Sequence, residues 1–124
     1  SDKSLPAADI RMEIQITATK AEGAERRLQV AVPAARVAEA RNKAAARVSK
    51  QVRIPGFRPG KAPAAMVKKA YAQAIDQEAV DQLLREAFQA VLEQEKLDLA
   101  TQPHAHDVKF GDDDTLSFEL HCEV

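Results

Sequence analysis

Two closely spaced Pro-Gly dipeptides constrain the fold of this chain more than any other feature. Residues 54–63 read Ile-Pro-Gly-Phe-Arg-Pro-Gly-Lys-Ala-Pro, and we refer to them as the Pro-Gly loop. Proline presets φ for the first corner of a type II turn, and glycine accepts the positive φ of the second corner. The sequence therefore predicts two consecutive tight turns that present Phe57 and Arg58 between them. The ordinary alternative is that Phe57 folds back as a plug over the core.

Basic residues are concentrated around this loop. Residues 36–69 carry ten Lys and Arg against one Glu, a net charge of +9, whereas the other 90 residues carry 8 basic and 18 acidic groups. The basic residues are Arg36, Arg41, Lys43, Arg47, Lys50, Arg53, Arg58, Lys61, Lys68 and Lys69. Such segregation favours a basic surface that meets a polyanion over a basic helix face that is merely solvated.

Period-two alternation of apolar and polar residues predicts four strands. The first two cover residues 12–19 and 28–32 and are joined by a hairpin loop that contains Gly23, and Pro33 ends the second. The last two are separated by a turn at residues 111–114. The residues expected to share one face are His106, Val108 and Phe110 in the third strand, and Leu116, Phe118, Leu120, Cys122 and Val124 in the fourth.

Three helices are expected between the second and third strands. Residues 35–52 are rich in helix formers, Pro63 suits the first turn of a short helix, and Asp76 suits the N-cap of a third helix. The expected apolar stripes are Val37, Ala40, Ala44, Val48 and Val52 in the first helix, Met66, Val67, Ala70 and Tyr71 in the second, and Val80, Leu83, Leu84, Ala87, Phe88, Val91 and Leu92 in the third.

These elements predict an α+β domain over residues 12–124. It contains a four-stranded antiparallel sheet made of two hairpins, with a long, a short and a further long helix packed on one face. The Pro-Gly loop lies at the far tip of the first long helix. Residues 1–11 are polar and are expected to be a disordered leader or a cloning remnant.

Composition narrows the classes of function. The single cysteine, Cys122, excludes an internal disulfide and suits a reducing cytosol. No apolar run approaches the ~18 residues that span a bilayer, so no membrane partner is expected. The sequence offers no Ser-His-Asp arrangement and no Gly-rich phosphate loop, so we expect neither an active site nor a cofactor.

Imidazole and thiolate are zinc ligands, so the candidate metal ligands are His104, His106, His121 and Cys122. Period two places His121 and Cys122 on opposite faces of their strand, so the two cannot ligate one ion together. Ordinary strand histidines and an inert buried thiol are therefore favoured, and we expect no metal.

Residues 56–63, Gly-Phe-Arg-Pro-Gly-Lys-Ala-Pro, resemble the Gly-Phe-Arg-x-Gly-Lys-x-Pro signature of bacterial trigger factor, a chaperone that meets nascent chains at the ribosome. The segments 25–28, 52–53 and 118–120 also resemble the family pattern. The resemblance covers about residues 12–124 and corresponds to the N-terminal ribosome-binding domain of that family.

The resemblance implies that the loop binds the rim of the nascent-chain exit tunnel on the large ribosomal subunit, in the cytoplasm. Phe57 would insert into apolar surface, and Arg58 would pair with a carboxylate of a rim protein. The implied ribosome-binding residues are Gly56, Phe57, Arg58, Pro59, Gly60 and Lys61, and the implied auxiliary contacts to ribosomal RNA are Arg47, Lys50 and Arg53.

The resemblance further implies nascent polypeptides as partners and weak self-association. It also places the family's peptidyl-prolyl isomerase domain outside these residues. The chain departs from the family at Pro59, where some members carry Lys, and at Cys122, where Pro is usual.

Two other interpretations remain open from the residues themselves. A free-standing RNA-binding module would use the basic segment directly, although Phe57 and Tyr71 are the only aromatic residues there to stack on bases. An enzyme would need a paired acid and base in a cleft, and the sequence offers none.

Overall fold

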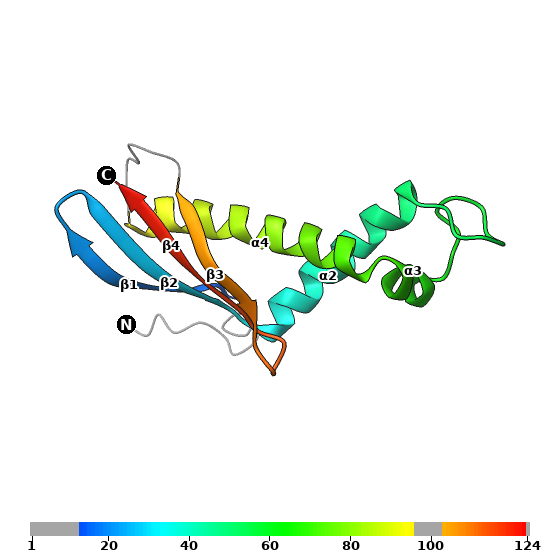
Figure 1. Ribbon diagram of the computed structural model, residues 1–124, viewed down its shortest axis with the longest axis horizontal. Helices are drawn as coiled ribbons and strands as arrows, with labels where there is room; N and C mark the ends of the chain where they lie inside the picture. The colour runs from blue at the N-terminus through cyan, green and yellow to red at the C-terminus, as the bar shows by residue number, and fades with distance from the viewer. Residues whose placement is uncertain (1–12, 96–102, 124) are drawn as a thin grey trace, which may run out of the picture. The chain divides into compact units, whose positions relative to one another are not determined.

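The computed structural model describes residues 13–95 and 103–123, which form two compact units. The first unit contains the described residues up to Val37 and from Leu84 onward, and the second runs from Ala38 to Leu83. The element order is β1-β2-α2-α3-α4-β3-β4 (Figure 1). The predicted leader, Met12 and Val124 lie outside the described residues.

The first unit is built on a four-stranded antiparallel sheet with the order β1-β2-β4-β3. The strands are β1 (Gln15–Glu22), β2 (Glu25–Val32), β3 (His104–Phe110) and β4 (Leu116–Glu123). β1 and β2 form one hairpin, β3 and β4 form the other, and β2 and β4 pair in the centre. The predicted α+β class and its two hairpins are confirmed.

Tight turns close both hairpins. The first turn is Gly23-Ala24, because Glu22 already pairs with Glu25, and Gly23 adopts a φ of 59° that favours glycine. The second turn is closed by hydrogen bonds from the Asp114 N–H to the Gly111 carbonyl at 3.1 Å and from the Gly111 N–H to the Thr115 carbonyl at 2.8 Å. Both turns lie where the sequence predicts them.

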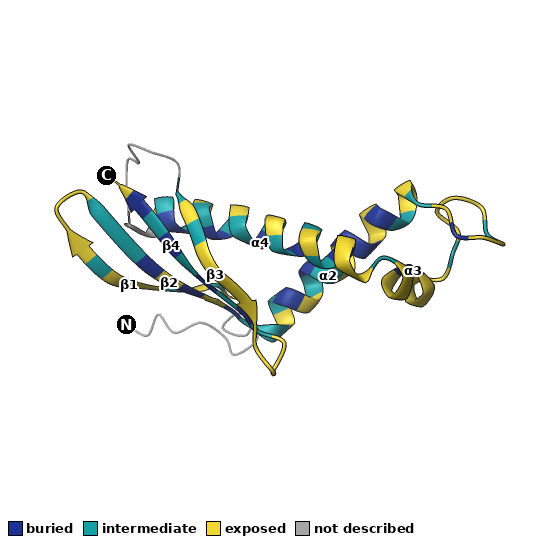
Figure 2. Cartoon of the chain, viewed as in Figure 1, coloured by how far each residue is buried: buried dark blue, intermediate teal, exposed yellow. Residues whose placement is uncertain are grey.

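One face of the sheet is buried. Its central pairs are Leu28 with Leu120, Val30 with Phe118, and Val32 with Leu116. All six residues are at most 1% exposed, and Cys122 continues the row (Figure 2). Burying a side chain of this size is worth about 1.5–3 kcal/mol, so these pairs stabilise the unit strongly. Period-two alternation in β4 therefore predicted this face correctly.

The prediction for the third strand is wrong. The register shifts between His106 and Lys109, and Asp107 in between has a φ of 56°. His106 consequently lies opposite Glu119 on the exposed face, whereas Phe110 lies opposite Leu116 on the buried face. An irregularity of this kind adds a residue to one strand and reverses the alternation beyond it.

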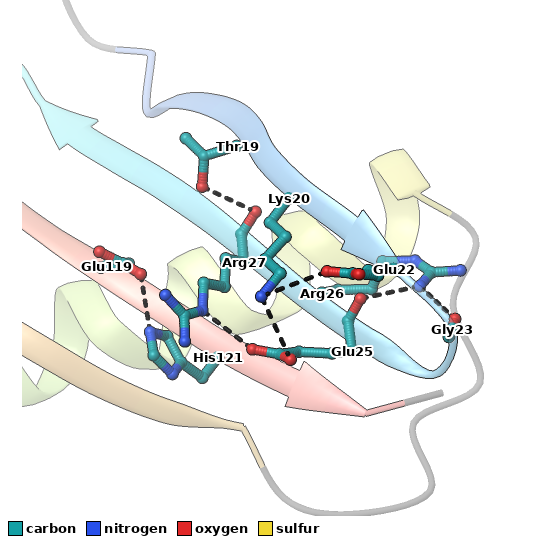
Figure 3. Close-up of polar contacts among 9 residues, drawn as sticks. All are labelled: Thr19, Lys20, Glu22, Gly23, Glu25, Arg26, Arg27, Glu119 and His121. Atoms are coloured by element: carbon teal, nitrogen blue, oxygen red, sulfur yellow. Dashed lines mark hydrogen bonds and ion pairs between the residues drawn. The ribbon is translucent and has the colours of Figure 1, made fainter.

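The other face of the sheet carries paired charges (Figure 3). Arg27 donates from Nε to Glu25 Oε1 at 2.9 Å, and Lys20 Nζ lies 3.6 Å from Glu25 Oε2. The Arg27 hydrogen bond, followed by the Lys20 charge, lowers the pKa of Glu25. His121 Nε2 is 2.7 Å from Glu119 Oε1 on the same face.

The three helices are α2 (Ala34–Gln51), α3 (Ala64–Ala70) and α4 (Ala72–Glu95). Pro33 ends β2, and its carbonyl accepts hydrogen bonds from the Arg36 and Val37 amides. The buried helical residues are Val37, Ala40, Ala44, Ala45 and Val48 in α2, Val67 in α3, and Ile75, Ala79, Leu83, Ala87 and Val91 in α4. None of the described helices has the length and apolar character that crossing a membrane requires.

Three details of the helix prediction need correction. Asp76 does not cap the third helix, because α4 already begins at Ala72. Met66 is 42% exposed instead of joining an apolar stripe, because only Val67 of α3 is buried. Val52 follows the end of α2 and is half-buried.

The buried thiol of Cys122 yields a testable prediction. Burial raises the pKa of Cys122 above its ordinary value of 9.0, and the Arg26 charge opposes this rise. We expect the folded protein to resist iodoacetamide at pH 8 and to react once urea unfolds it, because the thiolate is the nucleophile.

The folded state also holds the thiol proton of Cys122 more tightly than the unfolded state. The thiol's contribution to stability is thus complete below pH 9 and lost as the pH rises through the higher folded pKa.

Urea titrations at pH 7 and pH 10 test this pH dependence of stability, with Cys122→Ala as the control. The wild type should lose more stability than the variant between the two pH values. Rapid alkylation of the folded wild type at pH 8 would contradict the burial of this side chain.

Candidate functional site

The Pro-Gly loop lies within the second unit and contains two closed turns. The Phe57 N–H donates to the Ile54 carbonyl at 3.1 Å, and the Lys61 N–H donates to the Arg58 carbonyl at 2.9 Å. Gly56 and Gly60 have φ values of 89° and 79°, as the third residue of a type II turn requires. The two predicted turns are confirmed.

Exposure differs sharply along the loop. Ile54 is 9% exposed and belongs to the buried core, so it packs the start of the loop into its unit. Phe57 is half-buried, whereas Arg58, Pro59, Gly60 and Lys61 are exposed (Figure 2). Phe57 is therefore not a fully buried plug, and part of the residue's surface is accessible.

Short contacts fix the segments on either side of the loop. On one side, Val52 continues the helical hydrogen bonding of α2 by donating to the Val48 carbonyl at 3.1 Å. On the other side, α3 buries Val67. The Lys68 ammonium of α3 donates to Asn42 Oδ1 of α2 at 2.8 Å. The two helices that flank the loop, α2 and α3, are thus linked by a side-chain hydrogen bond.

Several of the clustered basic residues have acidic partners in their own unit. Arg41 Nε donates to Asp76 Oδ1 at 2.9 Å, which links α2 to α4. Arg47 makes a second link, because its Nε and Nη2 donate at 3.0 Å each to Glu78 and Gln82. These partners lie 31 to 35 residues away in the sequence, so no local pattern could have revealed them.

The remaining cations form a continuous stretch of the chain. Of the ten basic residues in the 36–69 segment, five make no ion pair or side-chain hydrogen bond with the described residues. They are Lys50, Arg53, Arg58, Lys61 and Lys69. All five lie between the last turn of α2 and the end of α3, so the charge of this segment that has no acidic partner among the described residues flanks the Pro-Gly loop.

The histidines of the sheet are separate from this site. His121 and Cys122 lie on opposite faces, as predicted, and the rings of His106 and His121 are 4.3 Å apart on the exposed face. In the part of the chain that the structure describes, no three His, Cys, Asp or Glu residues are grouped to hold a metal ion.

The second glycine of the loop gives a prediction about its conformation. We expect Gly60→Ala to lower the free energy of unfolding by about 1–2 kcal/mol, because an L-residue at positive φ is strained. A Cβ at this position would meet no atom of the described residues within 4 Å, so no clash with them would contribute. Gly60→Asn is the matched control and should cost less, since Asn tolerates this region. Urea denaturation measures both, and equal stability of wild type and Gly60→Ala would contradict the observed turn.

The sequence matches the family model of bacterial trigger factor protein (TF) over residues 14–124. Trigger factor of Marinomonas sp. (strain MWYL1) is 37% identical over 111 residues, which cover 90% of this chain and 25% of that protein. Trigger factor of Solibacter usitatus (strain Ellin6076) is 37% identical over 103 residues, which cover 83% and 24%. The chain thus spans about a quarter of the length of the curated relatives it matches.

A solved structure also has the same fold. It comes from work on promiscuous substrate recognition in folding and assembly by the trigger factor chaperone. It superposes with a TM-score of 0.74 at 19% identity and covers 88% of this chain and 26% of that one. This likeness shows that the same α+β fold occurs in a solved structure. The family itself is established by the match to the family model and by the sequence relatives. The chain belongs to the bacterial trigger factor family.

Proposed function

We propose that the Pro-Gly loop docks this domain on the large ribosomal subunit, at the rim of the exit tunnel, where the chaperone aids the folding of newly made proteins. The observation that carries the proposal is the loop itself, whose two closed turns present Phe57 and Arg58 outside the buried core. Nascent polypeptides are the clients of this activity, and the cytoplasm is its location.

Phe57 and Arg58 have complementary roles in this proposal. The accessible part of the Phe57 ring supplies apolar contact area, and the Arg58 guanidinium supplies a directional pair with a carboxylate of a rim protein. Pro59 and the two glycines hold both side chains in position before binding, which lowers the entropic cost of association. Lys61 lies beside them with no acidic partner in the described part of the chain.

Ribosomal RNA is the second partner that we propose. Lys50 and Arg53 support this role, because their charges are not neutralised within the described residues. Arg47 shares its guanidinium with Glu78 and Gln82, so a phosphate would have to compete with these groups. The family's peptidyl-prolyl isomerase domain is separate from the matched region, and we assign no catalysis to this loop.

Replacing both presented side chains should abolish docking. We expect Phe57→Ala with Arg58→Ala to remove most of the affinity for 70S ribosomes while the domain stays folded. Burial of a Phe ring is worth about 1.5–3 kcal/mol, and loss of a desolvated Arg pair costs about 2–5 kcal/mol. A micromolar complex has only about 8 kcal/mol in total. Co-sedimentation with ribosomes measures the binding, and circular dichroism monitors the fold.

Lys109→Ala with Phe110→Ala is the matched control, since it removes the same kinds of side chain from the first unit, where Phe110 is 37% exposed. This control should sediment like the wild type. Normal sedimentation of a folded Phe57/Arg58 variant would refute the proposed docking site. Equal binding of the wild type to naked RNA of any sequence would favour the free-standing RNA-binding module instead.

Arg47, which lies in α2, and Arg53, which follows the end of α2, should respond differently to substitution. Removing a cation that contacts an RNA phosphate flattens the dependence of log affinity on log salt by roughly 0.7–0.9. We expect Arg53→Ala to show such a change with little loss of stability. Arg47→Ala should instead lower the melting temperature, because it breaks the link to α4, and should change the salt slope less. The reverse pattern would show that Arg47 is the main RNA contact.

A further inference from the structure

A hollow with a volume of about 370 Å³ lies beside the Pro-Gly loop, within the second unit. It is lined by α2, by the end of the loop and by α3. Small residues from all three segments, including Ala46, Gly60 and Ala62, form much of the lining. Such residues leave room for a ligand to approach the backbone closely, and the described residues that line the hollow include no aromatic side chain.

The polar groups of the hollow have one sign of charge. Lys50 comes from α2 and Lys68 from α3, and no described residue of the lining carries a carboxylate. Lys50 has no acidic partner in the described part of the chain. Lys68 donates to the neutral oxygen of Asn42 at 2.8 Å, which orients its ammonium without cancelling its charge. An ammonium has three donors, so two remain for a ligand.

Neutral donors complete the lining. Asn42 accepts from Lys68 through Oδ1, which leaves its amide N–H groups to donate. Ser49, whose side chain carries a hydroxyl, lines the hollow as well. Ammonium, amide and hydroxyl groups are the donors that proteins direct at phosphate oxygens, and such contacts position a nucleic acid without reading its bases.

We propose that this hollow binds the phosphodiester backbone of RNA, with Lys50 and Lys68 on its phosphates. The inference rests on the proposed docking of the adjacent loop and names a second, sequence-independent contact to ribosomal RNA. Its lack of an aromatic platform excludes base stacking as the mode of binding. Because no described lining residue carries a carboxylate, the positive charge of the two lysines is available to attract the RNA backbone.

Removal of the two lysines tests the proposal. We compare Lys50→Gln with Lys68→Gln in one double variant, and Lys43→Gln with Lys69→Gln in another. The second pair takes the same charge from the same two helices outside the lining. The affinity for large ribosomal subunits is measured from 50 to 200 mM salt. The first variant should flatten the log–log salt slope by about 1.4, or 0.7 for each phosphate contact to unpaired RNA. Its deficit relative to the wild type should therefore shrink roughly sevenfold over this range.

The control variant should keep nearly the wild-type slope. An equal change in both variants would overturn the proposal, because it would show only the general field of the basic segment. A photoreactive benzoylphenylalanine in place of Ala46 identifies the occupant directly. Cross-links to RNA in ribosome complexes are expected, and cross-links to protein alone would overturn the proposal. The proposed docking role of the Pro-Gly loop is tested separately. If that role is wrong, the Phe57/Arg58 variant will bind ribosomes normally.

Discussion

Positive φ at two glycines is the constraint on which the Pro-Gly loop depends. Gly56 and Gly60, at 89° and 79°, allow two turns to close within one short segment. The prolines before them restrict the unfolded chain as well as the folded one, so less entropy is lost on folding. The buried Ile54 holds this small structure to its unit. A half-buried aromatic residue and an exposed arginine are thereby fixed in position.

The distribution of charge divides the basic segment into two parts. Arg41 and Arg47 are joined to Asp76 and Glu78 of α4, so they hold helices together within the second unit. The cations from Lys50 to Lys69 lack such partners among the described residues, apart from the neutral contact of Lys68. Surface ion pairs are worth only about 0–1 kcal/mol each. Their larger consequence is that the charge of the basic segment left without acidic partners among the described residues lies next to the loop.

The sequence predicted the features that depend on local chemistry and missed those that depend on distant partners. Pro-Gly turns and the alternation of β4 follow from neighbouring residues, and both are confirmed. The reversal of alternation after His106 depends on one residue at positive φ, Asp107, which the hydrophobic pattern does not reveal. Asp76 fits an N-cap locally, yet α4 begins at Ala72 and its carboxylate pairs with Arg41. The hollow beside the loop required the packing of three segments and had no sequence signal.

Amide hydrogen exchange of the chain, alone and bound to large ribosomal subunits, tests the central claim most directly. Exchange reports the opening of individual hydrogen bonds, and the loop contains two that are assigned, from Phe57 and from Lys61. Binding through the loop should slow exchange over residues 54–63 and leave the β1-β2 hairpin unchanged. Slowed exchange in the sheet with no change in the loop would contradict the account.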